Sequence, residues 1–320
     1  MKLVTYNVNS IKARLPRLIE YLTEQQPDVV CLQEIKCSDD TFPASDIEAA
    51  GYGAVWHGQK GFNGVAVLAK GATPVERQRG LDGEPEDEHS RYLECDIDGL
   101  VVASIYLPNG NPQPGPKFDY KLRWMERLAA RAQGLLNAEM PVVLMGDYNV
   151  IPNDDDTYSV RAMADDALMQ PESRAAYRRL LAQGWTDALR TRKPKGGVWT
   201  FWDYQAGAWQ RDAGFRIDHL LLSPQAADRL ADAGVDKDYR GREKASDHAP
   251  TWVRLTLGAS RRRCWRSPHP RRWRRAATCV PSVPGSTRRR ASSTVAACWS
   301  KPRWSTGRST GSPTAAPTRC

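Results

Sequence analysis

PVVLMGDYN, residues 141–149, joins an apolar run to a polar turn. A short continuous apolar run of this kind is typical of a buried strand. The strand period of two predicts that the side chains of Asp147 and Asn149 point the same way beyond the strand end. A carboxylate and a carboxamide placed there suit a hard cation, an attacking water and a phosphoryl oxygen. The stretch therefore predicts an enzymatic site at the end of a central strand.

Similar apolar runs alternate with helical patterns on either side of this stretch. The strands are expected at Leu3–Val8, Asp28–Gln33, Tyr52–His57, Gly64–Ala69, Arg91–Asp96, Leu100–Leu107, Val142–Met145, Trp199–Trp202, Ile217–Leu222 and Thr251–Leu257. The helices are expected from near Pro16, over Lys117–Asn137, over Glu172–Gln183 and after Pro224. Hairpins mixed with βαβ steps predict an α/β fold, a four-layered sandwich of two packed mixed β-sheets flanked by helices.

The charge of the chain is divided unevenly between two parts. The 320 residues carry a formal net charge of +9, which is typical of a nucleic-acid binder. Of the 46 Lys and Arg residues, 15 lie in residues 259–320, which contain no Asp or Glu. Residues 1–258 therefore hold 31 basic against 37 acidic residues, a net charge of −6. A polyanion bound by this part must be held by local basic patches and by metal.

The composition also divides the chain into a domain over residues 1–257 and a basic, low-complexity tail over residues 258–320. The tail contains no Leu, Ile, Phe or Tyr, and we expect it to be disordered. It could add non-specific affinity for polyanions or act as a nucleic-acid-binding arm. Its composition favours a third interpretation, translation of GC-rich coding sequence out of frame.

Cysteine usage and hydropathy predict a cytoplasmic protein. Cys31, Cys37 and Cys95 have no metal-binding or disulfide spacing, which suits a reducing compartment. No apolar stretch approaches the ~20 residues of a membrane span. No signal peptide precedes the first strand-like run. We therefore expect no membrane association.

Several predicted strand ends carry acid, amide or imidazole groups. They are Asn7, Glu34, Asp147 with Asn149, Asp218, and Asp247 with His248. Each has an ordinary explanation alone: Asn7 could cap a helix and Glu34 could be a solvated loop acid. Together they supply oxygen ligands that favour Mg²⁺ or Mn²⁺ over zinc, and a histidine, His248, that Asp218 could orient. The set predicts metal-assisted phosphodiester hydrolysis.

The order of the motifs carries a resemblance to a known family. The motifs are Asn7, Leu32–Lys36, His57–Gly61, Tyr106–Gly110, Gly146–Asn149, Phe201–Tyr204, Arg216–Asp218 and Ser246–Pro250. Over residues 1–257 the chain resembles the abasic-site endonuclease branch of the endonuclease/exonuclease/phosphatase superfamily, the branch of bacterial exonuclease III.

The resemblance implies a role for each matching residue. It implies a metal site formed by Asn7, Glu34, Asp147, Asn149, Asp247 and His248, with Glu34 as the main ligand. It implies catalytic roles for Tyr106, which stabilises the transition state, and for Asp147, Asn149, Asp218 and His248. Whether Asp147 or His248 removes the proton of the attacking water stays open. Asn9 stands where many relatives have an aspartate, which weakens the case for a second metal ion.

The resemblance also implies a substrate and a cofactor. The expected enzyme is Mg²⁺-dependent, with Mn²⁺ substituting, and it acts as a monomer on double-stranded DNA. Its expected activities are incision at abasic sites, 3′–5′ exonucleolytic digestion, and removal of 3′-blocking groups as a 3′-phosphatase and phosphodiesterase. The pocket for an abasic sugar would be lined by Asn109, Phe201, Trp202 and Phe215. Lys36, Lys60, Arg91, Lys117, Lys121 and Arg123 could contact DNA phosphates, although such residues are common on any surface.

Two other functions compete with this one. A superfamily member could act on another substrate, such as RNA or a phosphoinositide. The His57–Gly61 and Tyr106–Gly110 loops argue against that alternative. A non-catalytic nucleic-acid-binding module is the rival from another class, but the chain holds every acid, amide and imidazole that hydrolysis needs.

Overall fold

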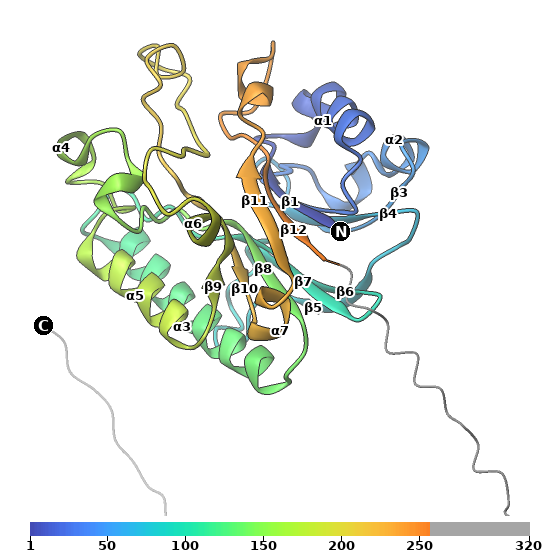
Figure 1. Ribbon diagram of the computed structural model, residues 1–320, viewed down its shortest axis with the longest axis horizontal. Helices are drawn as coiled ribbons and strands as arrows, with labels where there is room; N and C mark the ends of the chain where they lie inside the picture. Colours follow the sequence, from blue (N-terminus) through green and yellow to red (C-terminus); the bar gives the residue numbers. More distant parts are fainter. Residues whose placement is uncertain (257–320) are drawn as a thin grey trace, which may run out of the picture. The chain divides into compact units, whose positions relative to one another are not determined.

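The computed structural model describes residues 1–256, which form two six-stranded β-sheets packed face to face between helices (Figure 1). The strands are β1 (Lys2–Asn7), β2 (Val29–Gln33), β3 (Tyr52–His57), β4 (Val65–Lys70), β5 (Val75–Arg79), β6 (Tyr92–Ile97), β7 (Leu100–Tyr106), β8 (Val142–Asp147), β9 (Thr186–Asp187), β10 (Asp218–Leu222), β11 (Leu230–Val235) and β12 (Thr251–Leu255). The helices are α1 (Ile11–Gln25), α2 (Ala44–Ala49), α3 (Pro116–Asn137), α4 (Val160–Met163), α5 (Pro171–Ala182), α6 (Ala188–Arg192) and α7 (Pro224–Ala227). The prediction for residues 258–320 lies outside the described residues.

The two sheets share one pattern of strand pairing. The first has the order β11-β12-β1-β2-β4-β3, and only its β1–β2 pair is parallel. The second has the order β5-β6-β7-β8-β10-β9, and only its β7–β8 pair is parallel. A crossover helix joins each parallel pair, α1 in the first sheet and α3 in the second.

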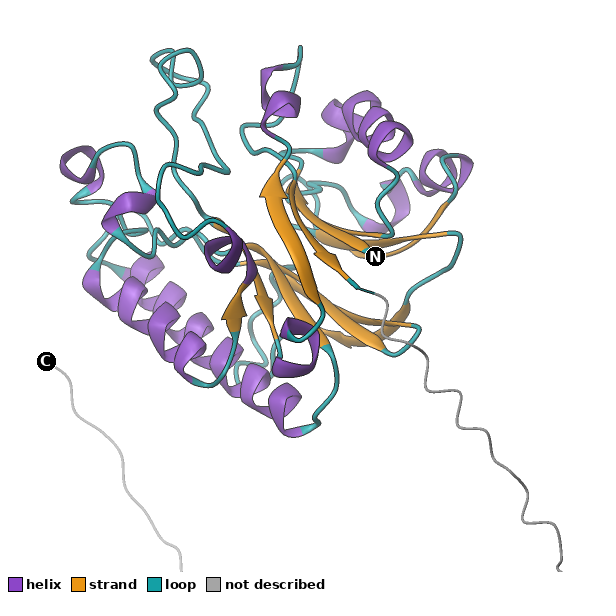
Figure 2. Ribbon diagram, in the orientation of Figure 1, coloured by secondary structure: helices purple, strands orange, loops and turns teal. Residues whose placement is uncertain are grey.

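Strand periodicity separates the core into an inner and two outer layers. Leu3 of β1 and Val143 of β8 belong to the cluster between the sheets. Their neighbours Val4 and Leu144 face outward, Val4 into the cluster with α1 and Leu144 into the cluster with α3 and α5. Figure 2 shows these helices covering the outer faces, so the predicted four-layered α/β sandwich is confirmed.

Two predicted elements differ from the structure. Helix α1 begins at Ile11 and contains Pro16, because the backbone N–H groups of Ser10 and Ile11 donate to the carbonyls of residues 34 and 35 and fix an earlier start. Residues 199–202 form no strand. Only Phe201 makes β-bridges there, with Phe215 and His248, so this segment crosses between two loops instead of joining a sheet.

Two further findings bear on the composition-based expectations. Among residues 1–256, no helix is both long and apolar enough to cross a membrane. Cys31, Cys37 and Cys95 are buried free thiols, as the unpatterned cysteine spacing predicts.

Candidate active site

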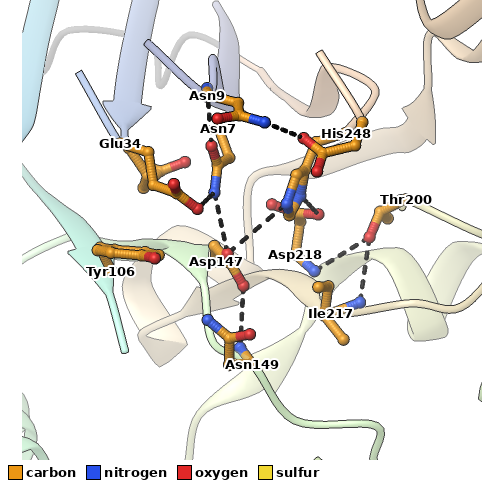
Figure 3. Close-up of polar contacts among 12 residues, drawn as sticks. Asn7, Asn9, Glu34, Tyr106, Asp147, Asn149, Thr200, Ile217, Asp218 and His248 are labelled. Carbon is orange, nitrogen blue, oxygen red and sulfur yellow. Dashed lines mark hydrogen bonds and ion pairs between the residues drawn. The ribbon is translucent and has the colours of Figure 1, made fainter. Parts of the chain in front are cut away.

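The carboxyl ends of β1, β2, β7 and β8 meet the start of β10 at one edge of the sandwich (Figure 3). Asn7 ends β1 and Glu34 follows β2, whereas Tyr106 ends β7 and Asp147 ends β8. In the second sheet the strand register pairs Asp147 with Tyr106 on one side and with Asp218 on the other. Polar side chains from both sheets thereby converge on one place.

The Asn7 carboxamide connects the two sheets at this edge. Its Nδ2 donates to Oε1 of Glu34 at 2.8 Å and to Oδ2 of Asp147 at 3.0 Å. Its Oδ1 accepts from the backbone N–H of Asn9 at 3.0 Å. Asn7 is fully buried, so this amide fixes the spacing of the two carboxylates without solvent competition.

His248 lies between two buried carboxylates. Its Nδ1 is 2.8 Å from Oδ2 of Asp218, and its Nε2 is 3.7 Å from Oδ2 of Asp147. Burial alone would lower the pKa of His248, but Asp218, Asp147 and Asp247 outweigh burial and raise that pKa to about 10. Burial likewise raises the pKa of Asp147 to about 7. The carboxylates at the two ring nitrogens therefore favour the imidazolium form of His248 over the neutral ring.

Thr200 holds the strand that carries Asp218. Its Oγ1 accepts from the backbone N–H groups of Ile217 and Asp218, each at 3.1 Å. Ser246 has a similar role before His248, because its Oγ donates to the carbonyl of Asn7 at 2.7 Å. These two hydroxyls fix the loops that bring Asp218, His248 and Asn7 together.

Tyr106 borders the carboxylates on the side of the second sheet. Burial raises the pKa of Tyr106 well above its ordinary value, and the charges of Glu34 and Asp147 raise it further. The guanidinium of Arg91 lies 4.7 Å from the centre of the Tyr106 ring. The phenol stays protonated at neutral pH and can donate a hydrogen bond to an oxyanion.

Asn149 is not oriented by the strand period, because β8 ends at Asp147 and Asn149 has a left-handed φ of 46°. Its backbone N–H donates to Oδ1 of Asp147 at 3.0 Å. Its side-chain Nδ2 donates to the carbonyl of Leu107, and its Oδ1 accepts from Nδ2 of Asn109 at 3.1 Å. The two asparagine amides therefore form one unit beside Asp147.

Lys121 of α3 supports the Asn109–Asn149 pair. The sequence did not identify Lys121 as a structural residue. Its fully buried Nζ donates to the backbone carbonyls of Asn109, at 3.0 Å, and Asn149, and burial lowers the pKa of Lys121 to about 7. It is therefore unavailable for the DNA phosphate contact that the sequence suggested. The helical periodicity of the sequence does indicate that Lys121 is buried, because it falls on the apolar face of α3 with Phe118, Met125 and Leu128.

The acidic groups fit a divalent cation. One ligand atom each of Glu34, Asp147 and His248 lies within 4.8 Å of the others, so the residues present could hold a metal ion. The carboxylate oxygens of Glu34 and Asp147 are donors that suit a hard cation, and Nε2 of His248 lies beside them. The Asp247 carboxylate accepts from Asn9, and the amide of Asn149 is engaged with Asn109 and Leu107.

The aromatic residues near the site fall into two groups. The Phe201 ring lies 4.7 Å from the Phe215 ring and 5.0 Å from the His248 ring, measured between centroids. Trp202 is fully buried, packs on Trp209 and donates its indole N–H to Asp212. The structure therefore places Phe201 and Phe215 beside His248, whereas the Trp202 ring is fully buried against Trp209.

Comparison with known proteins agrees with this geometry. Residues 4–248 match the Endonuclease/Exonuclease/phosphatase family. Exodeoxyribonuclease III of Haemophilus influenzae is 34% identical over 265 residues, which cover 79% of this chain and 99% of the relative.

Two solved structures resemble the chain closely. An AP endonuclease from Archaeoglobus fulgidus has a TM-score of 0.77 at 37% identity and covers 80% of this chain and 100% of its own. The 3′ phosphatase NExo from Neisseria, bound to a product DNA hairpin, has a TM-score of 0.78 at 36% identity with the same coverage. With these matches added to the fold and to the arrangement of Asn7, Glu34, Asp147 and His248, the chain belongs to the endonuclease/exonuclease/phosphatase family.

Proposed function

We propose that this chain is a Mg²⁺-dependent DNA repair phosphodiesterase that incises DNA at abasic sites, removes 3′-blocking groups and digests duplex DNA from 3′ ends. The observation that carries the proposal is the convergence of Glu34, Asp147 and His248, three groups from distant parts of the chain, within 4.8 Å. The names of the relatives support DNA as the substrate.

The cation is assigned to the carboxylates of Glu34 and Asp147, beside the Asn7 amide that fixes their spacing. When bound, Mg²⁺ would neutralise phosphate charge and stabilise the leaving oxygen, with Mn²⁺ as a substitute. The partly buried carboxylate of Glu34 and the buried carboxylate of Asp147 supply oxygen ligands, which these ions prefer.

The remaining groups divide the proton chemistry between them. Asp147 is the residue assigned to orient and deprotonate the attacking water, since its carboxylate faces the shared space. His248, with a carboxylate at each ring nitrogen, donates a hydrogen bond to the phosphate. Tyr106 donates to the oxygen on which charge grows, and Asn149 holds the water against the phosphate. Asp218 acts through His248 and is a positioning residue.

Substrate selection is assigned to Phe201 and Phe215, and to Asn109, which lies beside Asn149. Extruding a nucleotide costs least where the base is already missing, so a small apolar wall selects damaged DNA by shape. The proposed wall keeps Asn109, Phe201 and Phe215 from the sequence-based prediction and leaves out Trp202, whose ring is fully buried.

A single assay tests the proposed function. A duplex with one abasic analogue, an undamaged duplex with recessed 3′ ends, and a phosphoinositide are each incubated with the protein, with Mg²⁺ or with EDTA. Metal-dependent incision at the lesion is expected. Cleavage of the phosphoinositide without cleavage of DNA would overturn the proposal. The expected monomer is checked by sedimentation, and the expected cytoplasmic location by fractionation of the source cells.

A further inference from the structure

Three asparagine amides form a continuous series that leads into the site from the segment between α4 and α5. Asn111, in the loop between β7 and α3, donates through Nδ2 to Oδ1 of Asp166 at 3.0 Å and to Oδ1 of Asn109 at 2.8 Å. Asn109 in turn donates through Nδ2 to Oδ1 of Asn149 at 3.1 Å. The series ends beside Asp147, which accepts from the backbone N–H of Asn149 (Figure 3).

The direction of each amide depends on the groups that it meets. The oxygen and the NH₂ group of a side-chain amide occupy similar space, so the amide can be turned end for end at little cost of its own. A backbone N–H can only donate, and a carboxylate or a backbone carbonyl can only accept, so neighbours of these kinds decide the orientation. Asn109 is exposed, and its direction is therefore set by its hydrogen-bond partners.

Groups with a single role direct the first two amides of the series. Oδ1 of Asn111 accepts from the backbone N–H of Ala167 at 3.0 Å, while Nδ2 meets the Asp166 carboxylate. Oδ1 of Asn109 accepts from the backbone N–H of Asn111 at 3.2 Å, in addition to the Nδ2 of the same residue. Nδ2 of Asn109 is consequently the end that faces Asn149.

The last amide, Asn149, is held by a donor and an acceptor together. Its Nδ2 donates to the carbonyl of Leu107 at 2.9 Å, and its Oδ1 accepts from Asn109. If Asn109 were turned, two amide oxygens would face each other. Asn149 would then lose the hydrogen bond from Asn109, or it would turn as well and lose the one to Leu107. Because Asn149 is buried, an unpaired amide group there is costly.

We infer that Asp166 and Asn111 are positioning residues, which act through Asn109 to set the direction of the Asn149 amide. The inference rests on the proposed function, in which Asn149 holds the attacking water against the phosphate. In the observed direction, Oδ1 of Asn149 keeps a second lone pair that can accept from that water. A turned amide would present N–H groups instead. Neither Asp166 nor Asn111 needs to touch the substrate.

The experiment exchanges the two side chains in the double variant Asn111→Asp/Asp166→Asn. A hydrogen bond between positions 111 and 166 is kept, but its direction is reversed, because the new carboxylate at position 111 can only accept. That carboxylate would accept from Nδ2 of Asn109 and turn the amide. The matched control is Asp165→Asn, at an exposed neighbour outside the series.

The exchanged pair is expected to keep a Tm near that of the wild type and to lose about 10–100-fold in kcat on abasic DNA. Asn111→Asp alone should lower both values, because two carboxylates then face each other. Asn111→Ala is a second variant, which removes the Nδ2 donor without adding a charge, and its kcat should lie between those of the wild type and the exchanged pair. Asp165→Asn should change neither quantity.

Nuclear magnetic resonance of the side-chain amides gives a readout that does not depend on activity. The ¹H–¹⁵N signals of Asn109 and Asn149 are assigned by their loss in Asn109→Asp and Asn149→Asp, in protein without metal or substrate. Both signals should shift in the exchanged pair and stay in place in Asp165→Asn.

The outcomes separate the inference from the proposed function. Wild-type kcat in the exchanged pair or in Asn111→Ala would overturn the inference, because a hydrogen bond in either direction, or none, would then serve equally well. An unmoved Asn149 signal in the exchanged pair would also overturn it. A wild type that does not cleave abasic DNA would contradict the proposed function, and the amide signals would still decide whether Asp166 and Asn111 direct Asn149.

Discussion

His248 shows how much of the site depends on the charge of single residues. It is buried, it faces Asp218 at 2.8 Å and Asp147 at 3.7 Å, and its pKa is raised to about 10. Because this pKa lies above the ordinary value of ~6.5, the charged pair stabilises the fold fully below about pH 6.5. That contribution is lost as the pH rises through about 10.

Replacing Asp218 by asparagine is expected to lower the pKa of His248, because the carboxylate that favours the imidazolium is removed. At pH 6 the variant should lose about 3–5 kcal/mol of unfolding free energy, and this deficit should shrink as the pH approaches 10. Nuclear magnetic resonance titration of the metal-free protein measures the pKa, and urea unfolding measures the stability. His219 is an internal control, since burial and Arg216 already lower its pKa to about 4. An unchanged midpoint for His248 would contradict the assigned pairing.

Asp147→Asn is expected to reduce kcat on abasic DNA by about 10²–10⁴-fold, because an amide cannot accept the proton of the attacking water. The variant keeps the shape of the side chain and one of its two accepted hydrogen bonds, from Asn7 or from the backbone N–H of Asn149, so DNA affinity should stay near that of the wild type. Single-turnover cleavage and fluorescence anisotropy measure the two quantities. Near-normal turnover would show that Asp147 is not the base.

Among the elements, helix α3 does more than cover the second sheet. Through Lys121 it reaches the loop after β7 and the turn after β8, and it joins the backbone carbonyls of Asn109 and Asn149. The packing is close, because a Cβ on Gly110 would meet Cδ of Lys121 at 2.7 Å. The helix thereby sets the position of both asparagine amides beside Asp147.

Lys121→Met should keep the apolar packing of α3 but release the two loops. A displacement of about 1 Å at a reacting group costs on the order of 10²-fold in rate, so kcat should fall by ~10–100-fold with little change in KM. Steady-state kinetics at a temperature where the variant is fully folded measure both constants. Lys70→Met, at an exposed lysine, should change neither. A lower Tm without a loss of kcat would show that Lys121 stabilises the fold but does not position the catalytic loops.

Strands that carry apolar runs could be predicted from the sequence, and strands without such runs could not. Asn7, Glu34 and Asp147 could be located because each ends or directly follows a buried strand, so a break in hydrophobicity marks it. The edge strands β5 and β11 are polar and partly exposed, as edges of sheets commonly are, and they gave no such signal. Thr200 and Ser246 could not be assigned either, because a hydroxyl that supports a distant loop leaves no local pattern.

At the scale of the folded domain, the site depends on how the two sheets are joined. Buried polar groups connect them directly beneath it: Gln33 donates to Ser104 at 3.0 Å, and Ser104 donates to the carbonyl of Leu32 at 2.8 Å. The inter-sheet core surrounds these contacts with apolar side chains from both sheets. Such buried, fully paired groups favour one relative position of the sheets over its alternatives.

The charge of the whole chain leads to a prediction about the tail. Every proposed site residue lies within residues 1–256, so a protein ending at residue 258 should cleave abasic DNA at the wild-type rate. Its DNA affinity should depend less steeply on salt, because 15 basic residues are removed. Cleavage rates and plots of log Kd against log salt concentration measure both effects. Loss of cleavage would give the tail a role that its composition does not indicate.

The Asn7 amide joins Glu34 of one sheet to Asp147 of the other, so turnover depends on the relative position of the two sheets. Each sheet also has its own backbone hydrogen bonds, which do not depend on that position. Gentle heating or a low denaturant concentration that shifts one sheet slightly against the other would therefore abolish turnover. Far-ultraviolet circular dichroism would still report native strands and helices under those conditions. In a protein with this architecture, loss of activity is expected at a lower temperature or denaturant concentration than loss of secondary structure.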